Sequence, residues 1–317
     1  MKLLVGIRNS KLSNLQSEIV IQEISKYIIK NEHELSVKHI KTMGDIKNTE
    51  RLDKLGGKGL FAKEIEDQLI RDEIQLAVHS LKDLPSKNTN GLDIVAFLMH
   101  TQRNDVLISN SGKKLANLSP GSTIGTSSIR RRSQILRLRK DLNIKLLRGN
   151  VDTRIKKLRE LEYDAIILSY AGIARLGFGN IITEILDFEN FMPAACQGII
   201  GVQTTSNSQH KEILKSVNQT ETNIIAETER EVLRLIGANC NSPVSVLAQI
   251  KRNKIELACQ ILDHHGNLLF KGFETDDQTN SIKLAYQMSE QILSVVGQKN
   301  IDDLDNLKDD FDYSPKH

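Results

Sequence analysis

Aromatic residues are scarce in this chain of 317 residues: they make up 4% of it, and tryptophan is absent. A surface that stacks nucleic-acid bases needs several exposed aromatic rings, so the composition argues against a nucleic-acid-binding platform. No apolar run approaches the roughly 20 residues that a membrane-spanning helix requires, and the mean hydropathy is −0.31. Arg8 interrupts the apolar start of the chain and no small-residue cleavage site follows, so we expect no signal peptide and no membrane partner.

Cysteine is also rare. Cys196, Cys240 and Cys259 show no CxxC spacing, which fits neither a disulfide framework nor a zinc site, so we expect a reducing, cytoplasmic location and no metal centre. The motifs GxGxxG, HExxH and GxSxG are absent too, and nicotinamide redox, zinc hydrolysis and α/β-hydrolase chemistry therefore have no support. Cys259 alternates with apolar residues and is expected to fill the core. Cys240 lies in a turn-rich loop, where a thiol is either inert or serves as a nucleophile or attachment point.

The chain does contain a regular alternation of strand-like and helix-like patterns. In the first hundred residues we expect strands at 2–7, 35–42, 74–78 and 92–98, and helices at 12–29 and 60–70. The same alternation returns with strands at 105–108, 122–124, 145–147 and 164–168, and helices at 129–139, 153–161 and 172–176. Such alternation predicts two α/β units with largely parallel sheets covered on both faces.

After residue 220 the pattern changes to one helix, three strands and a second helix, which predicts an α+β unit with a small antiparallel sheet. Because the strand-like run 198–203 is expected to return to the first unit, three domains are predicted: 1–99 with 197–217, then 100–196, then 218–317. Residues 301–317 carry six Asp against two Lys, and we expect them to form a frayed, solvated tail.

Positive charge is concentrated in one stretch. Residues 130–159 hold twelve Lys or Arg against two Asp, a local charge of +10 in a chain of net charge +3. Four of these arginines adjoin strand-to-helix turns: Arg130, Arg131, Arg148 and Arg154. In open α/β sheets, ligands bind at the carboxyl ends of strands, and guanidinium groups there bind carboxylate or phosphate bidentately. Five more of the twelve are interpreted as belonging to solvated helix faces, namely Arg137, Arg139, Lys156, Lys157 and Arg159.

Further polar residues occupy similar strand-end positions, namely Arg8, Ser10, Thr126, Ser127, Ser128 and Arg175. Several anion-binding groups in one cleft imply a substrate with several anionic groups. Lys82 and Asp83 follow another apolar strand and precede Pro85. Asp83 either caps a turn or faces a cation that forms transiently on a substrate. His79 is expected to be structural, and the GGKGL run around Lys58 is a weak match to a phosphate loop.

Taken in order, several segments resemble the porphobilinogen deaminase (hydroxymethylbilane synthase) family: GIRNSKLS, GGKGLFAKEIE, AVHSLKDLP, RNDVLIS, IGTSSIRRRSQ, LRGNVDTRIKKL and PAACQG. The resemblance covers essentially the whole chain to about residue 300. It implies two α/β domains of the periplasmic-binding-protein type II fold with the active site between them, and a third α+β domain that carries a cofactor cysteine. The implied reaction joins four porphobilinogen molecules head to tail with release of ammonia, and then hydrolyses the product to hydroxymethylbilane in tetrapyrrole (heme) biosynthesis.

The resemblance also implies residue roles. The primer would be a dipyrromethane bound to Cys240 by a thioether, and Asp83 would be the catalytic carboxylate. The cofactor-binding residues would be Ser10, Lys82, Asp83, Thr126, Ser127, Ser128, Arg130, Arg131 and Arg148. The substrate-binding residues would be Arg8, Ser10, Lys58, Arg148, Arg154, Arg175 and Gln197. The chain departs from the family pattern at Ala238 and Asn239, where Gly-Gly is usual, and at Cys196, where Gly is usual; Arg132 extends the usual arginine pair and receives no role.

Two other functions compete with this one. A non-catalytic anion-binding protein of the same two-domain fold would need no Cys240 and would usually carry an export signal. A nucleic-acid binder using residues 130–159 would show salt-dependent affinity for DNA or RNA, against which the low aromatic content argues. The patterns show no strong apolar surface stripe, so we expect a monomer whose partner is the small-molecule substrate.

Overall fold

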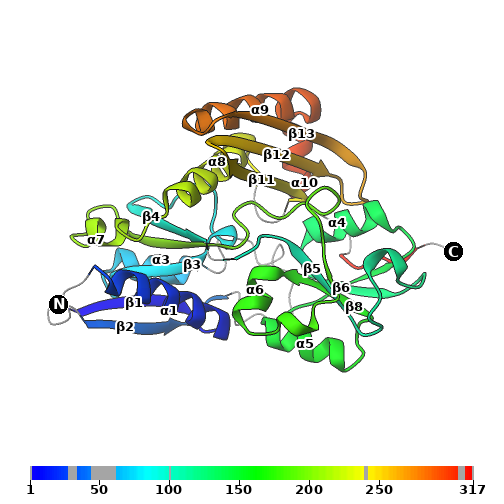
Figure 1. Cartoon of the computed structure of the whole chain (residues 1–317), viewed down its shortest axis with the longest axis horizontal. Helices are drawn as coiled ribbons and strands as arrows, with labels where there is room; N and C mark the ends of the chain where they lie inside the picture. Colours follow the sequence, from blue (N-terminus) through cyan, green and yellow to red (C-terminus); the bar gives the residue numbers. More distant parts are fainter. Residues whose placement is uncertain are drawn as a thin grey trace. The chain divides into compact units, whose positions relative to one another are not determined.

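The computed structural model describes residues 2–27, 34–43, 62–99, 101–238, 242–305 and 311–315. By internal contacts the chain divides into two compact units, Met1–His100 with Gly198–Glu227 and Thr101–Gln197 with Thr228–His317. Figure 1 labels helices and strands along the chain. Residues 45–55, a polar stretch whose length predicts a mobile lid, lie outside the described residues. No helix in the described part of the chain is long and apolar enough to cross a membrane.

The first unit is built on a five-stranded sheet of order β2-β1-β3-β10-β4. Its strands are β1 (Lys2–Arg8), β2 (Glu34–Ile40), β3 (Leu76–Ser80), β4 (Leu92–Met99) and β10 (Ile199–Thr205). Its helices are α1 (Lys11–Ser25), α3 (Lys63–Ile70) and α7 (Lys211–Lys215), with a 3-10 turn, η1, at Leu81–Asp83. β1 pairs in parallel with β2 and β3, whereas β10 is antiparallel to both its neighbours.

Alternation along β1 explains why both faces of this sheet are covered. Leu3 and Val5 are fully buried in one cluster that also contains Val20 of α1. Leu4, on the opposite face, packs against a second cluster that contains Ile65 of α3. The period-2 pattern therefore supplies two apolar faces, each with its own helix.

The second unit contains a five-stranded sheet of order β7-β6-β8-β5-β9. The strands are β5 (Asp105–Ser109), β6 (Thr123–Thr126), β7 (Asn143–Leu146), β8 (Ala165–Ser169) and β9 (Glu184–Ile185). The helices are α4 (Ile129–Leu138), α5 (Val151–Arg159) and α6 (Tyr170–Arg175), with 3-10 turns η2 (Leu115–Asn117) and η3 (Gly179–Ile181). β6 is parallel to β7 and β8, while β5 is antiparallel to β8 and β9. The two sheets thus share one topology, the strand order of the type II periplasmic-binding-protein fold that the resemblance implies.

The second unit also contains a three-stranded antiparallel sheet of order β11-β12-β13. Its elements are β11 (Val244–Lys251), β12 (Lys254–Leu262), β13 (Leu268–Asp277), η4 (Gln278–Asn280), α9 (Ser281–Val296) and α10 (Gln298–Asp305), and α8 (Thr220–Ile236) precedes them. Cys259 is fully buried on β12, as its alternating pattern predicts. The predicted fold class, two α/β parts with an α+β part that has a small antiparallel sheet, is confirmed.

The prediction of a frayed tail over residues 301–317 is wrong for the described part of that segment. Residues 298–305 form α10, in which Ile301 and Leu304 are buried. Phe311 is buried as well, and Tyr313 pairs with Ile144 of β7. The prediction considered only the Asp residues of this segment. The apolar side chains between them are buried against the rest of the protein and hold the segment in place.

A buried ion pair joins α8 to the loop before β10 and to β11. Glu229 is fully buried and accepts from the guanidinium of Arg103 at 2.6 Å. Its carboxylate also accepts from the backbone N–H groups of Cys196 and Ala248, each at 2.6 Å. Cys196 has φ of +58°, a left-handed conformation that favours glycine. The geometry therefore explains why glycine is usual at this position of the family pattern.

The turn between β12 and β13 packs tightly against α4 at Gly266. This glycine has φ of +82°, and a Cβ there would lie 2.5 Å from the Arg137 nitrogen and 2.7 Å from the Ser133 oxygen. We expect Gly266→Ala to lower the free energy of unfolding by about 2–5 kcal/mol, because backbone strain and a backbone clash add together. Urea unfolding measures this loss. Gly112→Ala is the matched control, since Gly112 has φ of +68° and no atom within 4 Å of the added Cβ; equal losses in the two variants would contradict the clash.

Candidate functional site

In the first unit, four predicted site residues lie at the carboxyl ends of two adjacent parallel strands. Arg8 ends β1, and Ser10 caps α1, with its hydroxyl accepting from the Ser13 N–H at 3.1 Å. Lys82 and Asp83 form η1, immediately after β3. β1 and β3 are paired in parallel, so these four residues lie at the same edge of the sheet. All four are partly exposed, so their polar groups are accessible to a ligand.

Local sequence explains how Lys82 and Asp83 are presented. Leu81 and Leu84 are buried and anchor both ends of the short turn, and Pro85 prevents regular structure from continuing. The two charged residues between the leucines are therefore held at the surface of a rigid turn. His79, on β3, is buried and hydrogen-bonded to the Gln203 side chain at 3.1 Å. Burial, aided by the charge of Arg8, lowers the pKa of His79 to about 4, which agrees with the structural role predicted for it.

In the second unit, the turn from β6 to α4 carries the predicted hydroxyl donors. Thr126 is fully buried, and its hydroxyl oxygen accepts from the Ser128 N–H at 3.2 Å. Ser128 caps α4 and accepts from the Arg131 N–H at 3.4 Å. Ser127 and Ser128 are partly exposed. Ser128 thus serves as the N-cap of α4.

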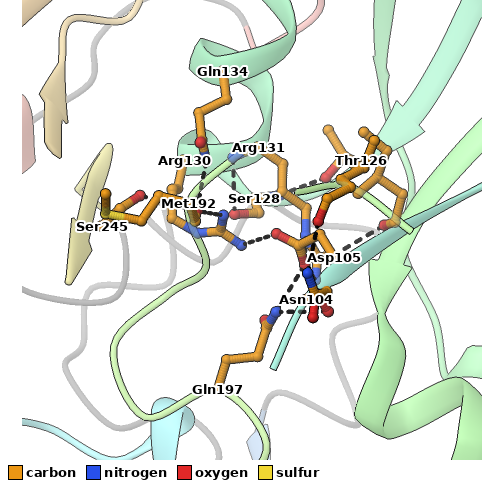
Figure 2. Close-up of polar contacts among 12 residues, drawn as sticks. Asn104, Asp105, Thr126, Ser128, Arg130, Arg131, Gln134, Met192, Gln197 and Ser245 are labelled. Atoms are coloured by element: carbon orange, nitrogen blue, oxygen red, sulfur yellow. Dashed lines mark hydrogen bonds and ion pairs between the residues drawn. The ribbon is translucent and has the colours of Figure 1, made fainter. Parts of the chain in front are cut away.

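Arg130 and Arg131 are buried on α4, with exposed fractions of only 4% and 6%, and both are paired with Asp105 of β5. Figure 2 shows the arrangement. Asp105 Oδ2 accepts from Arg130 Nη2 at 2.8 Å. Asp105 Oδ1 accepts from Arg131 Nε at 3.0 Å and from Arg131 Nη2 at 2.7 Å. Sequence reasoning missed Asp105, although it stands in the RNDVLIS segment and the +10 charge of residues 130–159 called for a buried counter-charge.

Backbone carbonyls complete this cluster. Arg130 Nη1 donates to the Met192 oxygen at 2.7 Å, and Arg131 Nη1 donates to the Ile167 oxygen at 3.0 Å (Figure 2). Burial lowers the pKa of Arg130, and Asp105 opposes that effect. Two guanidinium groups share one carboxylate, so the cluster keeps an excess positive charge near the N-terminus of α4, where the helix dipole is also positive.

Gln197 belongs to the same cluster. Its side-chain amide donates to Asp105 Oδ1 at 3.0 Å and to the Arg103 oxygen at 2.8 Å, and the residue is fully buried. The hydrogen bonds described for Gln197 therefore stabilise the arrangement around Asp105. These contacts are with other protein groups, whereas the resemblance implies that Gln197 contacts the substrate.

Three further predicted arginines of the second unit, Arg148, Arg154 and Arg175, are partly exposed. Arg148 follows β7, in a loop where Gly149 adopts φ of +112°. Arg154, on α5, donates through Nε to the Gly149 oxygen at 2.7 Å and so stabilises that loop. Arg175 ends α6, and desolvation by burial lowers its pKa to about 10. A nearby carboxylate strongly stabilises the charged form of a guanidinium group that burial has desolvated.

The structure brings the predicted residues together in two groups, one in each unit. Arg8, Ser10, Lys82 and Asp83 share one sheet edge. Thr126, Ser127, Ser128, Arg130 and Arg131 lie at the end of β6, in the turn after it and at the start of α4. Lys58 and Cys240 lie outside the described residues. Among the residues that are described, no group of three or more His, Cys, Asp or Glu is placed to hold a metal ion.

The strand order and these strand-end groups define an α/β protein of the periplasmic-binding type, with guanidinium, ammonium and hydroxyl donors suited to carboxylates. Two family models match the chain: the porphobilinogen deaminase, dipyromethane cofactor binding domain, over residues 3–213, and the porphobilinogen deaminase C-terminal domain, over residues 223–294. The chain therefore belongs to the porphobilinogen deaminase family, a family of transferases, and the resemblance seen in the sequence is confirmed.

Two relatives in sequence agree with this assignment. The porphobilinogen deaminase of Chloroherpeton thalassium is 37% identical over 291 residues, covering 92% of each chain. That of Carboxydothermus hydrogenoformans is 37% identical over 304 residues, covering 96% of this chain and 97% of the relative. Among solved structures, the aliphatic sulphonate binding protein SsuA of Escherichia coli has a TM-score of 0.40 at 13% identity, covering 73% of this chain and 69% of its own.

Proposed function

We propose that this chain catalyses the stepwise head-to-tail condensation of four porphobilinogen molecules, with release of ammonia, followed by hydrolysis to hydroxymethylbilane. The observation that carries the proposal is the match to both family domains, over residues 3–213 and 223–294. The geometry supports it, because Asp83 is a partly exposed carboxylate at the same sheet edge as Arg8 and Lys82. A non-catalytic anion receptor, the alternative function with the same fold, is not favoured by these matches.

The donor set fits the cofactor. A dipyrromethane carries acetate and propionate groups, and the second unit offers Ser127, Ser128, Arg148, Arg154 and Arg175 as partly exposed donors for carboxylates. The desolvated guanidinium of Arg175 suits such a ligand. When bound, the cofactor would supply the nucleophilic pyrrole carbon that starts the chain.

We assign the attachment to Cys240. Cys196 and Cys259 are both buried, and burial raises the pKa of the Cys259 thiol; a buried, protonated thiol is a poor nucleophile. Cys240 belongs to the connection between α8 and β11, whose flanking residues Ala238 and Ser242 are buried anchors. The turn-rich sequence around Cys240 favours an accessible thiol.

The residues of the first unit would perform the chemistry. Asp83 would stabilise the positive charge that develops as ammonia leaves and would accept the proton that the attacking pyrrole loses. Arg8, Ser10 and Lys82 would bind carboxylates of the substrate or cofactor at the same sheet edge. Lys58 is assigned to substrate by the family pattern alone.

The residues of the second unit would bind and orient the carboxylates of the growing chain. The family pattern assigns Thr126, Ser127, Ser128, Arg130, Arg131, Arg148, Arg154, Arg175 and Gln197 to this role, and Gln197 would act by holding Asp105 in place. Asp105 is a positioning residue in this scheme, because it holds both guanidinium groups of α4 in one orientation without itself touching substrate. Its negative charge also reduces the repulsion between the two buried guanidinium groups.

Domain boundaries, location and oligomeric state complete the proposed function. The chain is divided into domains at 1–99 with 197–217, at 100–196 and at 218–317. It acts as a cytoplasmic monomer, and its partner is porphobilinogen rather than a nucleic acid. Size-exclusion chromatography with light scattering tests the monomer, and binding to DNA or RNA at low salt tests the absence of a nucleic-acid partner.

Intact-mass spectrometry tests the cofactor and its attachment. The wild-type chain should exceed its sequence mass by one dipyrromethane, and Cys240→Ser should lose both the excess mass and all turnover of porphobilinogen. Cys196→Ser is the matched control and should keep the adduct. An adduct retained in Cys240→Ser but lost in Cys196→Ser would show that the wrong thiol was chosen. Turnover by a wild-type chain of bare sequence mass would contradict the cofactor assignment.

A further inference from the structure

Residues 311–315, hereafter the docked segment, lie along the outer edge of β7. Tyr313 and Ile144 exchange both backbone hydrogen bonds, each at 2.8 Å. The Leu146 N–H donates to Asp312 Oδ1 at 2.7 Å. β7 is the edge strand of its sheet, and an edge strand presents backbone groups that need partners. The docked segment supplies those partners, although it follows β7 by more than 160 residues in the sequence.

The docked segment also contacts α4. Phe311 is buried in the core cluster that contains Ile135 and Leu136 of that helix. The Arg132 guanidinium carbon lies 5.8 Å from the centroid of the Phe311 ring, a cation–π distance, and Arg132 is only 3% exposed. Arg132 was the arginine without a role, and the acidic segment was expected to fray. The structure pairs these two features with each other.

Both elements that the docked segment touches lead directly to proposed carboxylate-binding residues. Leu146, held by Asp312, is followed one residue later by buried Leu147 and then by Arg148. Arg132 directly follows Arg130 and Arg131 on α4. The docked segment therefore joins the start of the Arg148 loop to the helix that carries the arginine pair, within one compact unit.

We infer that the docked segment is a positioning device for substrate: it fixes β7 and α4 so that Arg148, Arg130 and Arg131 present their guanidinium groups in a preset orientation to the carboxylates of porphobilinogen and of the growing chain. The inference rests on the proposed function. Preorganisation of binding groups acts mainly on affinity. Loosening the segment should therefore raise KM, while the chemical step at Asp83 in the other unit keeps its rate.

Phe311→Ala tests the docking through its core contact, and Phe273→Ala is the matched control, because Phe273 is 61% exposed on β13 of the same unit. Asp312→Ala tests it without touching the core, since Asp312 is exposed. Asp312→Asn keeps the Oδ1 acceptor for the Leu146 N–H and is the conservative rescue. The asparagine variant should behave like the wild type. If Asp312 acted only through its negative charge, Asp312→Asn would instead behave like Asp312→Ala.

Two measurements read out the result on the full-length, cofactor-loaded enzyme. Hydrogen–deuterium exchange of the Ile144 and Leu146 amides should become at least about tenfold faster in Phe311→Ala and Asp312→Ala, because local opening exposes them. In the same variants KM for porphobilinogen should rise roughly three- to tenfold, with kcat within about twofold of the wild type.

The outcomes separate the inference from the proposed function. A wild-type chain that does not consume porphobilinogen overturns the proposed function, whatever the exchange shows. With an active wild type, faster exchange at unchanged KM overturns the positioning role, and unchanged exchange overturns the docking itself. If Phe311→Ala does not fold, the Asp312→Ala and Asp312→Asn pair decides by the same two measurements.

Discussion

Asp83→Asn is expected to lower kcat for porphobilinogen consumption by at least about 100-fold. The asparagine keeps the shape of the side chain but removes its negative charge and its ability to accept a proton. Positioned proton transfer contributes about 10²–10⁴-fold to rate, and stabilisation of developing charge contributes further. Because Asp83 is partly exposed on an anchored turn, the free energy of unfolding should change by less than about 0.5 kcal/mol. Steady-state kinetics and urea unfolding on the same sample measure the two quantities.

A matched control separates this effect from a general loss of charge. Asp67 is a partly exposed carboxylate on α3 of the same unit, and Asp67→Asn should keep both activity and stability. Intact mass should show the Asp83→Asn variant loaded with cofactor or with a partly extended chain, since binding through the arginines is unaffected. Wild-type turnover in Asp83→Asn would return this carboxylate to the role of a turn cap.

Local periodicity predicted much of the fold. Alternation on β1 and β12 and helical spacing on α1 are properties of short windows, and burial on the folded structure follows them. Strand direction is different, because it depends on which partner a strand meets. β5 and β10 resemble their neighbours in sequence, yet both run antiparallel within their sheets. A predominantly parallel sheet was the natural prediction, and only topology shows where it is interrupted.

The candidate site divides in the same way. The positions of Arg8, Lys82 and Asp83 at strand ends follow from local pattern, and the structure places them at one sheet edge. The contacts of Arg130 and Arg131 do not follow from it, because their partner Asp105 is 25 or 26 residues away in sequence. The prediction for residues 311–315 was wrong for a related reason. It was based on the number of charged residues, which does not show that one phenylalanine, Phe311, is buried in the core.

Asp105→Asn is expected to cause a large loss of stability. Asp105 is fully buried and accepts from Arg130, Arg131 and Gln197. The variant leaves two buried guanidinium groups around a neutral amide, whose own N–H₂ would point at other donors. Removing one partner of a buried ion pair costs about 3–5 kcal/mol, so urea unfolding should show a loss of that size. Intact mass should show a larger fraction of chains without cofactor, since the arginine pair loses its fixed orientation.

The control uses an exposed ion pair of the same unit. Asp141 pairs with Arg139 at 2.6 Å, but its side chain is 42% exposed, and Asp141→Asn should cost less than about 1 kcal/mol. The double variant Asp105→Asn with Arg130→Met removes one charge of each sign, so it should lose less than the sum of the single variants, with a coupling of about 1–3 kcal/mol. Simple additivity would mean that Asp105 and Arg130 do not compensate each other, and the positioning role of Asp105 would then be wrong. Two results together would support the positioning role: coupling between Asp105 and Arg130 in the free energy of unfolding, and a larger fraction of Asp105→Asn chains without cofactor. They would show that the buried Asp105 carboxylate is needed for α4 to bind the cofactor.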